Sequence, residues 1–120
     1  MAKRSLKAGL ILHSRKMPAA TEDIKWGDHL VFSVETKMFV LFDVDDASRA
    51  VRFKCDEEDF DRLCEREGVA PSAYVGRYGW VEFEDVDEHD LNELKRLITK
   101  SHRIVVSKLS MRKQREVFGG

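Results

Sequence analysis

The chain has 120 residues, 42% hydrophobic and 36% charged, enough to bury the core of a single domain. Its formal net charge of -1 excludes strong nucleic-acid binding driven by a global excess of basic residues. The sequence holds no apolar run long enough to cross a membrane and no signal-peptide core, so we expect a cytoplasmic protein.

The first predicted element is a helix over about residues 5–16, because Leu6, Leu10 and Met17 recur at helical spacing. Pro18 ends this helix, since a residue that precedes proline is pushed out of the α region. His13 is interpreted as a partly buried spacer on the helix rather than as a ligand or base.

A block of three predicted strands follows. Residues 30–34 and residues 37–44 alternate between two faces, and the hairpin-length gap Glu35-Thr36 separates them. Residues 49–54 form the third run. On the second run, we expect the core face to hold Met38, Val40 and Phe42 and the uncovered face to hold Lys37, Phe39 and Leu41.

The second half of the chain predicts a helix, a strand and a longer helix. Asp56 has the pattern of an N-cap, and Gly68 ends its helix. A loop over residues 71–79 leads into a strand at residues 80–83. We expect Asp87 to cap the final helix, whose apolar stripe runs to Leu109.

This order predicts an α+β fold, a two-layer sandwich with a mostly antiparallel sheet and helices on one side. We expect one domain over residues 1–109 and a basic, frayed tail over residues 110–120. Cys55 and Cys64 lack metal-ligand spacing, and we expect neither a disulfide, nor a metal, nor any cofactor.

Several segments, taken in order, resemble the MmcQ/YjbR family of bacterial proteins over about residues 21–109. They are Thr21-Glu22-Asp23, Lys25-Trp26-Gly27, Val31-Phe32-Ser33-Val34, Lys37-Met38-Phe39, Val51, Phe53-Lys54, Asp56 to Phe60, Arg77-Tyr78-Gly79-Trp80-Val81 and the closing stretch from Glu93-Leu94 to Leu109. The resemblance implies a sandwich similar to secretion-chaperone-like and frataxin-like domains, a "double wing" of strand hairpins, and DNA binding. The chain departs from the family where Glu35-Thr36 replaces a turn glycine, which places an acid at a wing tip.

Catalytic patterns are weak. Trp26 and Trp80 are interpreted first as core or rim anchors and only second as platforms for stacking on bases. Asp28 and His29 could be imagined as a general-base pair, but neighbouring strand residues point to opposite faces. We therefore expect a protein that is not an enzyme.

The leading hypothesis is a small binding module that contacts DNA weakly and in a salt-sensitive manner through one sheet face. The expected contact residues are Lys37, Phe39, Arg52, Lys54 and Arg77, with the tail cations as a possible addition. The alternative is a protein-interaction or adaptor domain that uses the same sheet face for a protein partner or for a second copy. Neither hypothesis involves a membrane or a small-molecule cofactor.

Overall fold

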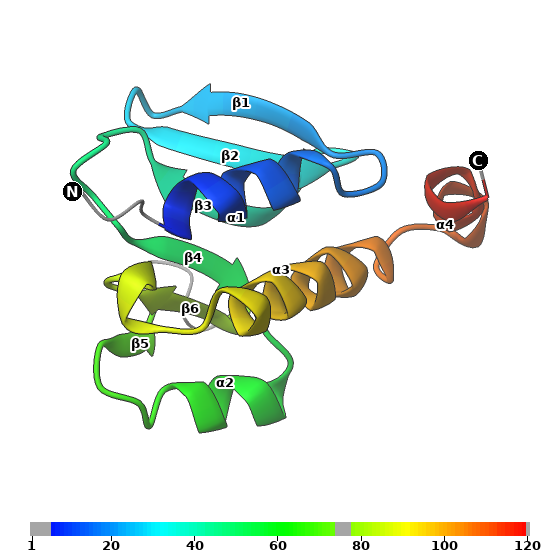
Figure 1. Cartoon of the computed structure of the whole chain (residues 1–120). Coiled ribbons are helices and arrows are strands. Elements are labelled where there is room, and N and C mark those ends of the chain that lie inside the picture. Colours follow the sequence, from blue (N-terminus) through cyan, green and yellow to red (C-terminus); the bar gives the residue numbers. More distant parts are fainter. Residues whose placement is uncertain (1–5, 74–77, 120) are drawn as a thin grey trace.

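Helices cover one face of a six-stranded sheet in the computed structural model, which describes residues 6–73 and 78–119 (Figure 1). The strands are β1 (Thr21–Lys25), β2 (His29–Val34), β3 (Lys37–Asp43), β4 (Val51–Lys54), β5 (Val69–Pro71) and β6 (Trp80–Phe83). The helices are α1 (Leu6–Arg15), α2 (Glu57–Leu63), α3 (Leu91–Val106), α4 (Met111–Phe118) and the short 3-10 helix η2 (Val86–Glu88).

The sheet has the order β1-β2-β3-β4-β6-β5, and every neighbouring pair is antiparallel. This confirms the α+β sandwich with its helices on one side. The two edge strands, β1 and β5, were not predicted. β1 is mostly charged and exposed, and β5 is three residues long, so neither has the alternating apolar pattern that identifies a strand.

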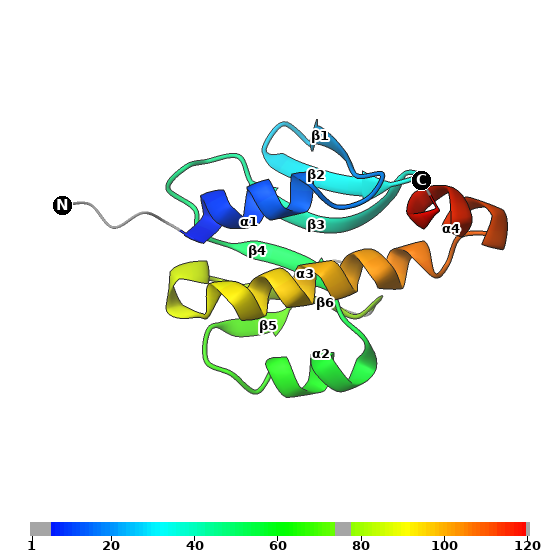
Figure 2. The ribbon, with the colours of Figure 1, turned by 45° about the vertical axis from the view of Figure 1, so that its right-hand side comes forward.

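The main core lies between the sheet and the helices. Figure 2 shows α1 and α3 side by side across the sheet. The fully buried side chains include the following: from the sheet Phe32, Phe42, Phe53 and Phe83, and from the helices Leu10, Leu63, Leu94 and Ile98. The predicted helical stripes therefore pack on one side of the sheet, as expected. Burial of each large apolar side chain stabilises the fold by about 1.5–3 kcal/mol.

A β-bulge in β3 changes the faces that simple alternation predicts. Phe32 pairs with Val40, whereas the next residue of β2, Ser33, pairs with Met38, so Phe39 is the extra residue. Phe39 and Val40 consequently both point into the main core, and Met38 joins Leu41 on the opposite face. The expected placement of Phe39 on the uncovered face is therefore wrong.

The bulge is held by α3. The Ser101 hydroxyl donates a hydrogen bond of 2.7 Å to the Phe39 carbonyl and accepts one of 3.0 Å from the Lys54 amide. The β3–β4 pairing ends at Val40 and Phe53, one residue before both of these main-chain groups, and a buried main-chain group without a partner is costly. Ser101 of α3 thus provides a hydrogen-bond partner for one main-chain group of β3 and one of β4.

Lys7 of α1 is buried although it is charged. Its Nζ donates to three main-chain carbonyls at the end of β3 and in the loop that follows, those of Asp43 (2.8 Å), Asp45 (2.9 Å) and Ser48 (2.8 Å). The ammonium group thereby replaces its hydration shell with protein oxygens. This lysine attaches the N-terminal helix to the loop that leads into β4.

The C-terminal segments differ from their predictions. Asp90, rather than Asp87, is the N-cap of α3, because η2 occupies the residues in between. The tail beyond Leu109 is a helix, α4, with Ser110 as its N-cap, so the expectation of a frayed tail is wrong. Val117 packs against the core, and the ring of Phe118 lies 5.9 Å from that of His102. Figure 1 shows α4 beyond the end of α3.

Candidate functional site

A groove of about 500 Å³ lies on the sheet face opposite the helices. It is lined by Trp26, His29, Met38, Leu41, Arg52, Ser72, Ala73 and Glu82. An apolar cluster that is distinct from the main core lies on the same face. It is formed by Val31, Leu41 and Trp80, with Met38 packed against them. The groove falls in the size range of ligand-binding clefts, which are typically apolar with a few placed polar groups.

Trp26 forms the exposed rim of the groove. It follows β1 in a tight turn in which Trp26 and Gly27 both have positive φ angles, 57° and 78°. Its side chain is 67% exposed, whereas that of Trp80 is 6% exposed. Trp80 is therefore an anchor, as expected, but the prediction that Trp26 belongs to the core or its rim is wrong. The indole of Trp26 lies edge-on to His29 at 5.7 Å.

Charged side chains form a continuous chain along the groove. His29 lies between two carboxylates, with Nδ1 at 2.5 Å from Asp28 and Nε2 at 3.6 Å from Asp43. Arg52 continues the chain, since it donates from one terminal nitrogen to Asp43 at 3.0 Å and from Nε to Glu82 at 2.5 Å. Asp28 and His29 do meet, contrary to the alternation argument, because Asp28 belongs to the turn and not to the strand.

The pKa shifts agree with this geometry. Burial raises the pKa of Asp43, but hydrogen bonds from Ser48 and Arg52 outweigh it, and the pKa ends below its usual value. Burial lowers the pKa of Arg52, yet its bonds to Asp43 and Glu82 leave it above the usual value. Arg52 is consequently a cation whose charge two carboxylates already match.

The residues expected to contact DNA do not share one surface. Arg52 and Lys54 lie on the groove side of β4, as expected. Lys37 is exposed but pairs with the core residue Val34, which places it on the helix side. Phe39 is buried in the core, and Arg77 lies outside the described residues.

No pattern in the sequence directly indicates the groove itself. Its rim residue, Trp26, is of a type that usually anchors the core. Its floor depends on the bulge at Phe39. One partial signal existed in the alternation of β4 and β6, which places Arg52 directly opposite Glu82 on the outer face. Opposite charges at paired positions predict an ion pair rather than a free cation.

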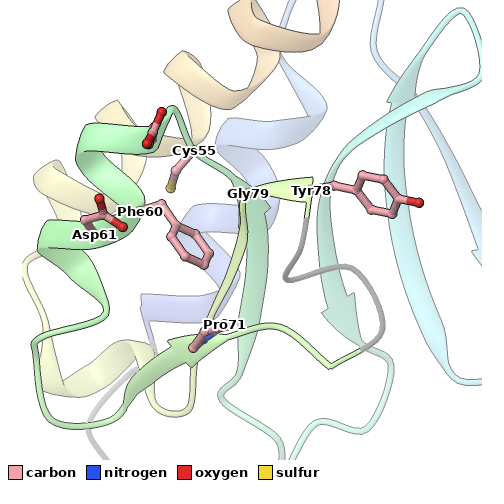
Figure 3. Close-up of a pocket in the computed structure, with 7 residues that line it drawn as sticks. Cys55, Phe60, Asp61, Pro71, Tyr78 and Gly79 are labelled. Carbon is pink, nitrogen blue, oxygen red and sulfur yellow. The ribbon is translucent and has the colours of Figure 1, made fainter.

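A second hollow lies beside α2 and is lined in part by Cys55, Phe60 and Pro71 (Figure 3). Burial, with the nearby Asp59, raises the pKa of the Cys55 thiol to about 12. A thiol of this kind is not a reactive nucleophile at neutral pH. Tyr78 also lines this hollow, although its ring points away from Cys55 and Phe60 in Figure 3.

Exposed cations follow the solvent face of α3, on the helix side of the sheet, and continue past its end into α4. They are Arg96, Lys100, Arg103, Lys108, Arg112, Lys113 and Arg115. Lys100 is paired with Asp56 at 2.7 Å and Asp59 at 2.8 Å, and Lys113 lies 3.6 Å from Glu35. For Arg96, Arg103, Lys108 and Arg115, the described residues show no ion pair.

Residues 6–73 and 78–119 hold neither a metal-binding cluster nor a membrane-spanning helix. No group of three or more His, Cys, Asp or Glu side chains is placed to hold a metal ion. None of the helices has the length and apolar character needed to cross a membrane.

Comparisons with known proteins agree on one family and one fold. The family model YjbR matches residues 15–104 of the chain. No curated protein matches it. The structure is similar to the crystal structure of Deinococcus radiodurans protein DR2400, which carries the domain DUF419, with a TM-score of 0.83 and 21% sequence identity. The match covers 92% of this chain and 86% of that chain, and at this identity it supports the fold alone.

Proposed function

This chain belongs to the YjbR family, and we propose that it is a non-enzymatic module that binds a segment of a partner protein in the groove of its helix-free sheet face. The observation that carries the proposal is the groove itself. It combines an apolar floor at Met38 and Leu41 with the exposed indole of Trp26 at its rim. Exposed aromatic side chains beside an apolar floor are typical of protein-binding surfaces.

The electrostatics of the groove favour a protein partner over DNA at this face. The expected phosphate-binding cation, Arg52, is already bonded to Asp43 and Glu82. A phosphate that approached Arg52 would meet two carboxylates within hydrogen-bond distance of the same guanidinium. Binding of DNA through this face therefore requires that an existing ion pair be broken.

We further propose that the module acts in the cytoplasm. Cys55 and Cys64 are both free thiols, which is the usual state of cysteines in a reducing compartment. We also propose that the groove does not catalyse a reaction, because its ionisable side chains are bonded to one another. His29 contacts Asp28 and Asp43. The hydroxyl of Ser72, the one serine among the described groove-lining residues, donates to the Ala73 carbonyl at 3.4 Å and not to His29.

The proposal is tested by selecting binders from a random-peptide display library on the immobilised full chain. The selected peptides are then measured against Met38→Glu, which places a charge in the groove. Met111→Glu on α4 is the matched control, because Met111 is exposed and distant in sequence from the groove. We expect Met38→Glu to weaken binding at least tenfold and Met111→Glu to leave it unchanged. An empty selection, or binders indifferent to Met38→Glu, would contradict the proposal.

DNA binding is the second candidate, and the cations of α3 and α4 favour it. Arg103, Lys108 and Arg115 are exposed on that side of the molecule without an ion pair among the described residues. Contacts from such side chains to phosphate would be independent of base sequence and sensitive to salt. This surface replaces the sheet face as the DNA-binding hypothesis.

Titration of labelled duplex DNA at several salt concentrations tests this candidate. Deletion of residues 110–120 removes Arg112, Lys113 and Arg115. If these cations bind phosphate, the salt slope should fall by about one unit for each lost contact. A parent chain that does not bind at high micromolar concentration, or a deletion that leaves the slope unchanged, would reject α4 as a DNA-binding element.

A further inference from the structure

We propose that the partner segment inserts a positively charged side chain, arginine or lysine, among apolar residues into the groove. This inference rests on the proposed function, because it concerns what the same groove recognises. It follows from the charged side chains in and beside the groove and from the side chain that forms its rim.

Carboxylates outnumber cations in the groove's chain of charged side chains. Three carboxylates, those of Asp28, Asp43 and Glu82, are joined through His29 and Arg52. Of the two residues that join these carboxylates, Arg52 carries a permanent positive charge, and it bonds Asp43 and Glu82. Asp28 and Asp43 contact groove-lining residues without lining the groove themselves. Lys25 and Lys54 lie on the same sheet face by their pairing, likewise outside the lining, and neither is bonded to this chain of side chains. A partner cation beside Asp28 or Glu82 would therefore meet carboxylates that the single charge of Arg52 does not neutralise.

The oxygens that remain open lie near the solvent. The Asp28 side chain is 73% exposed and that of Glu82 is 30% exposed. Arg52 bonds Glu82 through Oε1, and His29 bonds Asp28 through Oδ1, so each carboxylate keeps a second oxygen. A carboxylate accepts several hydrogen bonds, and a guanidinium or ammonium group is the donor that suits it.

Trp26 provides a second and independent reason. Its exposed indole stands at the rim, beside His29 and close in sequence to Asp28. An indole face attracts cations through its quadrupole, and arginine is the side chain most often found there. The apolar floor at Met38 and Leu41 would accommodate the aliphatic part of the same side chain and its apolar neighbours.

The test uses three display libraries that are random except for a fixed central residue, which is arginine, leucine or glutamate. Each library is selected on the full chain. The selected peptides are then measured against the Met38→Glu variant, and those that bind it more weakly are counted as groove binders. We expect most of the groove binders to come from the arginine library. If the leucine or glutamate library yields groove binders as readily, the inference is overturned while the proposed function survives. If all three libraries are empty, the proposed function fails.

Point variants then locate the charge. Glu82→Gln and Asp28→Asn should each weaken the arginine peptides about 3- to 10-fold, the effect of one partly exposed ion pair. Glu58→Gln, an exposed carboxylate on α2, is the matched control and should change nothing. Trp26 fluorescence reports binding, because the other tryptophan is buried. Thermal melts confirm that each variant is folded, and unchanged affinity in both groove variants would overturn the inference.

Discussion

Replacement of Lys7 by methionine should destabilise the protein far more than the loss of one surface charge. Methionine keeps most of the apolar stem but removes the Nζ group, which donates to the carbonyls of Asp43, Asp45 and Ser48. Lys7 is 7% exposed, so water reaches these three oxygens poorly while α1 stays in place. The loop between β3 and β4 would then lose its attachment to the N-terminal helix.

The magnitude follows from the hydrogen bonds. A hydrogen bond to a charged group contributes about 1.5–3 kcal/mol net, and a buried acceptor without a donor costs about 1–3 kcal/mol. The three bonds share one ammonium group, whose desolvation offsets part of their sum, and the loop can move to admit water. We therefore expect Lys7→Met to lower the free energy of unfolding by about 2–4 kcal/mol.

Urea denaturation followed by circular dichroism measures this change. At the size of this domain the melting temperature should fall by about 4 °C for each kcal/mol. Lys16→Met is the matched control, because Lys16 is exposed just after α1, and its effect should stay within about 0.5 kcal/mol. If the two variants differ by less than that amount, the buried ammonium does not support the loop as described.

Three further predictions concern the core, the hairpin and acid. Phe42→Ala should lower the free energy of unfolding by about 3–5 kcal/mol in a urea melt, since Phe42 is fully buried; a melt like that of the parent would show the strand faces to be wrong. Thr36→Gly should raise the free energy of unfolding by about 1 kcal/mol, because Thr36 has a φ of 70° in the β2–β3 turn. A variant less stable than the parent would disprove backbone strain at this position. Burial lowers the pKa of His102 below 6.5, so the unfolded chain binds a proton more readily and stability should fall as the pH drops below about 6.5. His102→Gln should flatten that fall in urea midpoints taken at pH 7 and pH 5, and an equally steep fall would exclude His102 as its cause.

The architecture was predictable from the sequence because its central strands and helices have clear periodicities. Phe32, Phe42 and Phe53 alternate with outward residues, and their burial follows directly. The details of the outer face were not predictable. A bulge depends on how two strands pair, and nothing in the local sequence of β3 indicates that Phe39 is the extra residue.

The candidate site was harder to predict for a similar reason. The sequence identifies Arg52 as an outward-facing cation, but its meaning depends on Asp43 and Glu82 from two other strands. A lone arginine suggests phosphate binding, whereas an arginine between two carboxylates belongs to an internal network. The helix at the C-terminus was missed because its residues are mostly exposed and charged, so its stability rests on the Ser110 cap and on contacts of Val117 and Phe118.

The order of the strands also governs how the chain can assemble during its synthesis. β1, β2, β3 and β4 are neighbours both in sequence and in the sheet, so this meander can form from local contacts as it leaves the ribosome. α1 is made before it but contacts residues near the other end, since Leu6 bonds Asp87 and His13 bonds Thr99. The packing of α1 is therefore complete only after α3 has been made, and the apolar face of the meander stays open until then.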